Sequence, residues 1–436
     1  MWYKKIDLQT VGVCGFLIYV MMDQLVLHFL PNEFLRYAFL GMMTACAVLC
    51  RGSTILTFQD LCLLLAVPFL IFNNAALTHG LYSSTITYAL ILTLFIFGKN
   101  GDKFFLPVFK VMAFFVIFYA LATIVLALMP SFYENTVIHL FVPADQISLK
   151  RTNAMGYYAG LTSHYSHNAM FMTLGVGLFG SLIMCGQFNS VKKNKILVMI
   201  GFILCTVVLL LTGKRGHVIF SGVSLAVAYY VYKSDKKGRR LLKIIIVFGF
   251  LIAAIYILSY FFPWLLNFIK RFNETEEAGN VYSGRDKLIA LAYELFQTSP
   301  VFGIGWYRFR YIHIQRMPWF TNMIHVHNVY MQLLCETGIV GFMIYMAFFI
   351  KNFYQCIRLS VAERKKKCII PKKFSFILSF SVFLQTFFLL YCMTGNPLYD
   401  NIIFLPYMLV TMMVIIINKN FAPNHLRKQK VVLKLN

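Results

Sequence analysis

The sequence predicts an all-α, polytopic integral membrane protein with a single membrane domain over residues 1–436. Three observations lead to this fold class. Hydrophobic residues make up 59% of the chain and charged residues only 13%. Apolar runs recur at lengths near the ~20 residues that a membrane-crossing helix requires. These runs are continuous, whereas the strands of a membrane β-barrel alternate apolar with polar residues.

About twelve segments have the length and hydropathy of membrane-spanning helices. In chain order they are residues 8–30, 34–50, 55–72, 82–98, 106–128, 167–185, 195–212, 216–232, 242–262, 328–350, 374–394 and 401–418. Lys4 and Lys5 precede the first segment, and no small-residue cleavage site follows it. We therefore expect the first helix to be retained rather than removed as a signal peptide.

The basic residues predict the orientation of these segments. With the N-terminus in the cytoplasm, the basic clusters at 192–195, 233–240, 363–367 and 427–434 all lie on the inner side. This is the distribution that the positive-inside rule requires, and it also places the C-terminus in the cytoplasm. Topology and attraction to anionic lipid headgroups account for the net charge of +24, so no nucleic-acid partner is predicted.

The ten cysteines do not form a recognisable site. They lie in apolar runs or in predicted inner loops, and the sequence contains no CxxC pair. Neither a disulfide framework nor a zinc site is therefore predicted.

Two long segments, residues 129–166 and 263–327, fall on the outer side in this topology. The second is rich in basic residues, including Arg285 and Arg308, and the turn at 212–216 adds Lys214 and Arg215 to the same surface. Cationic groups that collect on the outer side run against the positive-inside bias. They indicate an anion-binding site at the outer face. The alternative for any one arginine is a side chain that snorkels from a helix end.

The second outer segment contains a predicted amphipathic helix. Ser283 and Asp286 have the spacing of a capping box, and apolar residues follow at helical intervals until Ser299 and Pro300. Arg285 then lies in the first turn, where free backbone N–H groups favour an anion. Gly303 and Gly305 are interpreted as a tight turn. The alternative role for this helix is a membrane-surface anchor or a plug over the bundle.

A polar stripe follows in the segment at 328–350. Asn328, Gln332 and Glu336 are spaced four residues apart and share one helix face, so they are expected to line a cavity or a helix–helix seam. His325 and His327 could chelate a metal, but no third ligand is positioned, and no metal is predicted. Proton transfer or a hydrogen bond beside a cationic phosphate site suits His327 better. The alternative is a helix-capping His–Asn pair.

A second polar group occurs at the start of the segment at 167–185. Its members are either part of the same cavity or interhelical hydrogen-bond partners. They are Ser163, His164, Ser166, His167 and Asn168.

Three blocks of this sequence together resemble one known family. They are LTGKRG at 211–216, SGRDKLIALAYELFQTSPVFGIGWYRF at 283–309 and HNVYMQLLCETGIVG at 327–341. In this order they resemble the O-antigen ligase/polymerase family of bacterial envelope glycosyltransferases. That family's pattern is a small-Arg-Gly turn, an SGR-led helix with a Pro-x-x-Gly-x-Gly turn, and His-Asn-x-Tyr before a Glu and a Gly-x-x-Gly. Lys214 stands where members often have serine.

The resemblance implies a GT-C-like helical fold and a metal-independent enzyme without a cofactor. It implies a sugar chain on undecaprenyl diphosphate as donor, at the outer face of the bacterial cytoplasmic membrane. Carried over by motif, Arg215 and Arg285 would bind the diphosphate, and His327 would act on the acceptor hydroxyl as base or positioner. The further candidate substrate-binding residues are Lys214, Asn328, Tyr330, Gln332, Glu336, Arg308 and His325.

Together with the two outer segments, the resemblance favours a polymerase of O-antigen, capsule or exopolysaccharide that joins lipid-linked repeat units. Its expected partners are the lipid-linked donor and acceptor, the bilayer, a chain-length regulator and a flippase. Two outer segments could hold both substrates, with aromatic residues to stack on sugars or to form an interfacial belt. These are Trp264, Tyr282, Trp306, Tyr311 and Trp319.

Three alternatives stay open, and one of them, a structural assembly partner, would leave the grouping of Arg215, Arg285 and His327 unexplained. A ligase would transfer finished glycan to another acceptor. A transporter or flippase for lipid-linked oligosaccharide would be expected to have pseudo-repeated halves with broken helices near mid-membrane. The distinctive residues of this chain instead gather at one face.

Overall fold

The computed structural model describes residues 7–29, 32–49, 56–72, 74–78, 82–99, 101–186, 192–233, 284–317, 324–368 and 370–422. Every regular element in these residues is a helix, which confirms the all-α prediction. Six helices are long and apolar enough to cross a membrane. They are α6 (Phe105–Leu128), α9 (Tyr165–Cys185), α10 (Lys192–Leu211), α16 (Val329–Arg364), α17 (Lys372–Tyr391) and α18 (Asn401–Phe421). The protein is therefore a multi-pass membrane protein.

Further helices, of 14 to 22 residues, complete the bundle. They are α1 (Leu8–Phe29), α2 (Glu33–Leu49), α3 (Phe58–Ile71), α5 (Tyr82–Phe97) and α11 (Arg215–Tyr232), with a short α4 (Ala75–Thr78) before α5. Each predicted apolar segment within the described residues coincides with a helix. The segment at 242–262 and the basic clusters at 234–240 and 427–434 lie outside the described residues.

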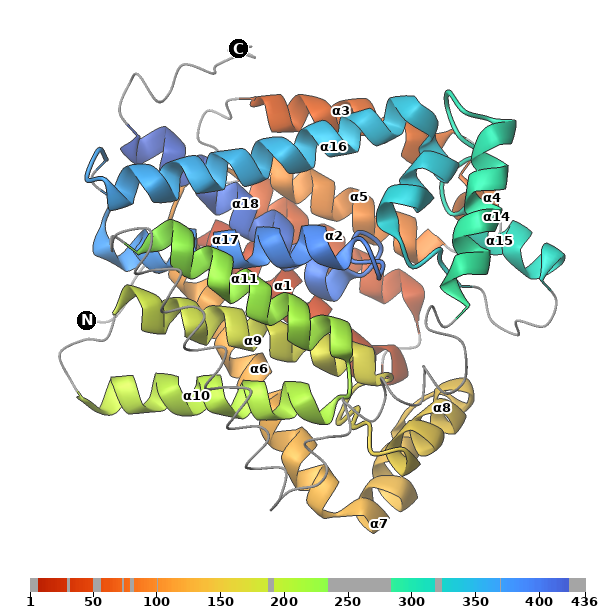
Figure 1. The fold of residues 1–436 in the computed structure, drawn as a ribbon, viewed down its shortest axis with the longest axis horizontal. Coiled ribbons are helices and arrows are strands. Elements are labelled where there is room, and N and C mark those ends of the chain that lie inside the picture. Colours follow the sequence, from red (N-terminus) through yellow and green to blue (C-terminus); the bar gives the residue numbers. More distant parts are fainter. Residues whose placement is uncertain are drawn as a thin grey trace.

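The long helices lie side by side, with α17 and α18 inside the bundle (Figure 1). Nearly all side chains of these two helices are buried, because neighbouring helices cover every face. Large aromatic and aliphatic residues fill the space between them, including a stacked pair formed by Phe388 and Tyr407 with ring centroids 4.1 Å apart. A helix that is apolar on all sides is expected in this position.

The segment at 129–166 is largely helical rather than an extended loop. It contains α7 (Pro130–Phe132), a π-helical turn (Tyr133–Val137), a 3₁₀ turn (Ile138–Leu140) and α8 (Pro143–Ala154). Tyr133, Ile138 and Leu149 belong to a small apolar cluster of this segment. The segment therefore has its own packed core beside the start of α9.

The amphipathic helix of the second segment is α14 (Arg285–Thr298), and α15 (Arg308–Arg316) follows it. Leu288, Leu291 and Leu295 of α14 are buried against Phe309 and Val326. The predicted capping box is wrong. The N-cap residue is Gly284, which adopts a left-handed conformation with φ of 76° and makes no side-chain cap bond. Ser283 lies outside the described residues.

The segment predicted as one continuous span at 328–350 is longer and is interrupted. It is α16 (Val329–Arg364), and Gly338 inside it has a non-helical backbone with φ of 65° and ψ of −170°. The helix therefore consists of a short part, 329–337, and a long part, 339–364. In Figure 1 the short part turns away from the axis of the long one.

The turn at 299–305 occupies this break. Ile304 and Gly305 donate their backbone N–H groups to the carbonyl oxygens of Cys335 and Glu336 at 2.9 and 3.0 Å, and Ile339 donates to Pro300 at 2.9 Å. A Cβ atom on Gly303 would lie 2.4 Å from the backbone carbon of Glu336. The backbone groups that the break leaves without helical partners are thus satisfied by this turn. The tight turn predicted at Gly303–Gly305 is a docking element for α16.

Candidate functional site

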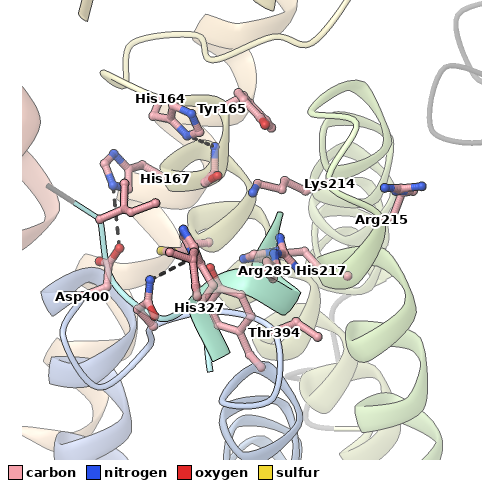
Figure 2. A pocket seen from close by; sticks show the side chains of 17 residues that line it. His164, Tyr165, His167, Lys214, Arg215, His217, Arg285, His327, Thr394 and Asp400 are labelled. Atoms are coloured by element: carbon pink, nitrogen blue, oxygen red, sulfur yellow. Dashed lines mark hydrogen bonds and ion pairs between the residues drawn. The ribbon is translucent and has the colours of Figure 1, made fainter. Parts of the chain in front are cut away.

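A cavity of about 530 Å³ lies where the starts of α9, α11 and α14 meet the approach to α16 and the loop between α17 and α18 (Figure 2). We call it the cationic cavity, because Lys214, Arg215 and Arg285 line it with Asp400 as the sole carboxylate among the described lining residues. Its other lining residues are His164, Tyr165, Ser166, His167, Met170, Gly216, His217, Leu288, Ile324, His327, Tyr391, Thr394 and Asn396.

The turn between α10 and α11 brings two cations to the cavity. Gly213 has φ of 64°, and a Cβ atom there would lie 2.3 Å from the ring of Tyr157. Only glycine suits this left-handed, crowded position. Lys214 then extends into the cavity, with its Nζ 5.0 Å from the centre of the Tyr165 ring. In Figure 2 Arg215 points away from His327, whereas Lys214 points toward the space beside it.

Arg285 enters the cavity from another direction. It is the first residue of α14, directly after the left-handed Gly284. The N–H groups at a helix start and the guanidinium both favour a negatively charged ligand. The structure thus brings together Lys214 and Arg285, which are about 70 residues apart in the sequence.

His327 lies between these cations and the loop after α17. Its backbone is left-handed with φ of 58°, and the next residue, Asn328, is the N-cap of α16. Its ring Nδ1 lies 3.0 Å from the side-chain nitrogen of Asn396. Burial, then the charges of Arg285 and Lys214, lower the pKa of His327 to about 4. The imidazole is therefore neutral at pH 7, with one ring nitrogen protonated and the other carrying a lone pair.

A second histidine faces a carboxylate across the cavity. His167 Nε2 lies 3.7 Å from Asp400 Oδ2, and the hydroxyl of Ser163 lies 3.2 Å from His167 Nδ1. Asp400 also caps α18, since its Oδ1 accepts the backbone N–H of Ile402 at 3.1 Å. Burial raises the pKa of Asp400, and the nearby His167 opposes that shift. This wall of the cavity thus offers a partly desolvated acid–base pair.

Sequence reasoning missed Asn396 and Asp400 and left the role of His167 open. Asn396 and Asp400 lie in the short connection between α17 and α18, which no periodic pattern distinguishes. Asp400 did carry one usable signal, because a carboxylate stands directly before an apolar run. Of the polar group before α9, His164, Ser166 and His167 line the cavity. Asn168 instead donates to Thr123 and Tyr158, as the interhelical alternative predicts.

Six predicted substrate-binding residues do not line the cationic cavity. Asn328 accepts the backbone N–H of Met331 at 3.0 Å as the N-cap of α16. Tyr330 donates its hydroxyl to the carbonyl of Leu389 at 2.8 Å. Arg308 donates to the carbonyl of Ile304 at 3.3 Å. These three side chains therefore have structural partners, and the same holds for His325, Gln332 and Glu336.

His325, Gln332 and Glu336 form a buried network. The side-chain nitrogen of Gln332 lies 2.8 Å from His325 Nδ1 and 3.1 Å from Glu336 Oε1. Tyr399 donates its hydroxyl to Glu336 Oε2 at 3.0 Å. Glu336 is fully buried. The predicted polar stripe is therefore a seam between the short part of α16 and the α17–α18 loop.

The candidate sugar-stacking residues include one that is buried and three that lie outside the described residues. Trp306 is buried, with its ring centroid 5.0 Å from that of Tyr399. It thus packs inside the protein instead of facing a ligand. Trp264, Tyr282 and Trp319 lie outside the described residues. Within the described part of the chain, no group of three or more His, Cys, Asp or Glu residues could hold a metal ion.

Comparison with known proteins matches the region that supplies the basic residues of this cavity. Residues 200–346, about a third of the chain, match the family model described as O-antigen ligase. No curated protein matches the chain. The matched region contains all three sequence blocks and supplies Lys214, Arg215, Arg285 and His327 to the cavity. The chain is therefore similar to the O-antigen ligase family over residues 200–346.

Proposed function

We propose that this protein is a polysaccharide polymerase that joins undecaprenyl-diphosphate-linked repeat units at the outer face of the bacterial cytoplasmic membrane. The observation that carries the proposal is the convergence of Lys214, Arg285 and a neutral His327 in one cavity. The family match supports glycan transfer in O-antigen biosynthesis. The polymerase activity, the donor and the roles of single residues are our proposal.

The cationic side chains suit a diphosphate leaving group. As the bond between the sugar C1 and the phosphate oxygen breaks, negative charge develops on the diphosphate. The guanidinium of Arg285 can donate two parallel hydrogen bonds to phosphate oxygens, and Lys214 adds a point charge from the facing turn. Fixed cations in a partly dehydrated cavity stabilise such charge strongly. Arg215 then holds the diphosphate from the rim of the cavity.

His327 suits the acceptor. Asn396 lies against Nδ1, so Nε2 is the nitrogen that faces the substrate. For Nε2 to take a proton, the Asn396 amide must turn its oxygen toward the ring, so that Nδ1 carries the hydrogen and donates it to Oδ1. Among the described residues Oδ1 of Asn396 is buried without a hydrogen-bond partner, which favours this orientation. The acceptor hydroxyl oxygen attacks C1, its proton passes to Nε2, and undecaprenyl diphosphate leaves from the opposite side. A single displacement of this kind inverts the anomeric centre. A bound diphosphate also offsets the charges of Arg285 and Lys214, which raises the pKa of His327 and makes it a better base once the donor is present.

The membrane arrangement is part of the same proposal. We propose about twelve spans in a GT-C-like bundle, with both termini in the cytoplasm and the cationic cavity at the outer end. A chain-length regulator and a flippase are the expected protein partners. The strongly basic segments at the other ends of α9, α11 and α16 support this orientation through the positive-inside rule.

A ligase is the second candidate, because the matched family model is described as O-antigen ligase. Both reactions use the same donor and the same cavity. They differ only in the acceptor, which is a second lipid-linked unit for a polymerase and a different glycan or protein for a ligase.

The test is elongation by purified full-length protein in lipid, supplied with undecaprenyl-diphosphate-linked repeat units in EDTA. We expect a ladder of longer glycans from the wild type and none from His327→Ala. His139→Ala is the matched control, since His139 is exposed and outside the cavity, and it should elongate normally. Donor that stays intact until a lipid A core acceptor is added identifies the ligase. A full ladder from His327→Ala refutes the proposed site.

A further inference from the structure

A second cavity lies at the opposite end of the helix bundle. Its volume is about 1,360 Å³, and it forms between α6, α9, the end of α11 and the connection from α16 to α17. The helices α9, α11 and α17 each have one end at the cationic cavity and the other end here. At ~1.5 Å per residue, helices of this length separate the two cavities by roughly the thickness of a membrane hydrocarbon core.

The rim of this second cavity, the basic groove, is strongly cationic. Among the described lining residues, six are basic: Lys110, Lys233, Arg364, Lys366, Lys372 and Lys373. The single carboxylate there belongs to Glu363, and it accepts a hydrogen bond from the Ser375 hydroxyl. Lys110, Lys366, Lys372 and Lys373 are exposed. The rim thus presents a large excess of positive charge to a ligand.

The walls of the groove are apolar. Leu106, Phe109 and Ala113 of α6 form one side, and Leu178 and Leu182 of α9 form another. Leu106 belongs to α6, a helix that can cross the membrane, and its side chain is 38% exposed, so this part of the apolar wall is not covered by protein. A ligand that fills the groove must therefore carry negative charge for the basic rim and apolar groups for the walls.

We propose that the basic groove binds one anionic phospholipid of the adjacent leaflet. Its phosphate lies among Lys366, Lys372 and Lys373, and its acyl chains follow the wall formed by α6 and α9. A basic pocket between transmembrane helices at the positively charged side recognises such headgroups. A soluble phosphate would leave the walls in contact with water, and a neutral lipid would leave the cations without a counter-charge.

The bound lipid would join elements that the protein itself connects only in part. Arg364 donates to the backbone carbonyls of Tyr230 and Val231 at 3.2 and 2.7 Å, which links the end of α16 to the end of α11. The lipid would connect that pair to α6 and α9 across the groove. This inference goes beyond the proposed glycan transfer, and only the identity of the leaflet depends on the proposed orientation.

The experiment measures thermal unfolding of the full-length protein in a neutral detergent with added dioleoylphosphatidylglycerol or dioleoylphosphatidylcholine. The groove variant is Lys372→Ala/Lys373→Ala. The matched control is Lys365→Ala/Lys367→Ala, which removes the same charge from neighbouring exposed residues that do not line the groove. A second variant, Lys372→Arg/Lys373→Arg, keeps the charge. sn-Glycerol 3-phosphate serves as the headgroup without chains.

We expect phosphatidylglycerol, but not phosphatidylcholine, to raise the unfolding temperature of the wild type, the control and the Arg variant. The groove variant should need roughly tenfold or more phosphatidylglycerol for the same shift, because two headgroup contacts are lost. If it does not fold, Leu182→Trp, which fills the groove from its apolar wall, should show the same loss. Equal responses of groove and control variants, or an equal shift with glycerol 3-phosphate, would overturn the proposal.

Discussion

Nδ1 of His327 lies 3.0 Å from the side-chain nitrogen of Asn396, so a residue of the α17–α18 connection fixes the ring that the proposed chemistry uses. The remaining nitrogen, Nε2, is thereby directed to the substrate. The two residues are 69 positions apart in the chain.

Replacing Asn396 by alanine should lower kcat by roughly tenfold, which corresponds to ~1.4 kcal/mol, with little change in KM for the donor. The ring would lose its orientation while the cationic residues still bind the diphosphate. Asn396→Asp places a carboxylate beside the imidazole and should raise its pKa. Steady-state kinetics across pH measure both effects, and an alanine variant with only KM altered would contradict a positioning role.

Arg285→Lys should reduce the rate of glycan elongation by about 10²–10³-fold. Lysine keeps the positive charge but loses the paired hydrogen bonds to phosphate oxygens. Arg316→Lys is the matched control, because Arg316 pairs with Glu294 on the surface of α14 and α15 and does not line the cavity. Product length on gels measures both variants. An unchanged length distribution in Arg285→Lys would argue for a scaffold instead of an enzyme.

The pH dependence follows from the lowered pKa of His327. The folded protein protonates this ring only near pH 4, whereas the unfolded chain does so near pH 6.5. The unfolded state therefore binds more protons between these values, and stability should decrease as the pH falls from about 6.5 toward 4. Lys214→Met removes a positive charge and should raise the pKa of His327. The acid limb of kcat/KM should then move to higher pH, and a limb that stays in place would refute the assignment.

Gly338→Ala should destabilise the protein by more than ~2 kcal/mol and lower its unfolding temperature. A Cβ atom at Gly338 would lie 2.3 Å from the carbonyl oxygen of Val301, and φ of 65° is unfavourable for alanine. Gly41→Ala is the control, since Gly41 lies inside α2 with no atom within 4 Å of the added Cβ. That change should be neutral or slightly stabilising. Equal effects at both positions would contradict the docking role of the break.

Glu336→Ala should reduce stability by ~1–3 kcal/mol, because the donors on Gln332 and Tyr399 would be left buried without their partner. Glu336→Gln preserves the shape and should cost less. Neither change should raise KM for the lipid-linked donor if Glu336 belongs to an internal seam. Thermal unfolding and donor titration, measured in parallel, separate the two effects. A large increase in KM for Glu336→Gln would restore Glu336 as a substrate ligand.

Local features of the sequence predicted the helices of the described residues well. Apolar runs marked the helices, and the spacing of Leu288, Ala292 and Leu295 marked the inward face of α14. The apolar runs and the helical spacing can both be recognised locally, because membrane burial requires apolar residues and helix geometry sets the intervals between them. The break in α16 was not predictable in this way. It depends on contact between Gly303 and the chain near Gly338, a pairing that neither segment shows alone.

The sequence also predicted part of the cationic cavity. Arg285, Lys214 and His327 stood out because charged and polar residues are unusual in an apolar chain, and the structure places all three in the cavity. Glu336 stood out equally, yet it faces Tyr399 instead. Polarity at a membrane position indicates that a residue must have a partner, but it does not indicate whether the partner is a ligand or another side chain.

The short part of α16 is held at both ends. Val329 donates its backbone N–H to the carbonyl of Cys392, and Ile339 donates to that of Pro300. One residue inserted or deleted between them would rotate the remaining side chains by about 100° around the helix axis. Glu336 would then leave Tyr399, or His327 would leave Asn396. The number of residues between His327 and Gly338 is therefore fixed by geometry, and functional variants of this chain are expected to change length elsewhere.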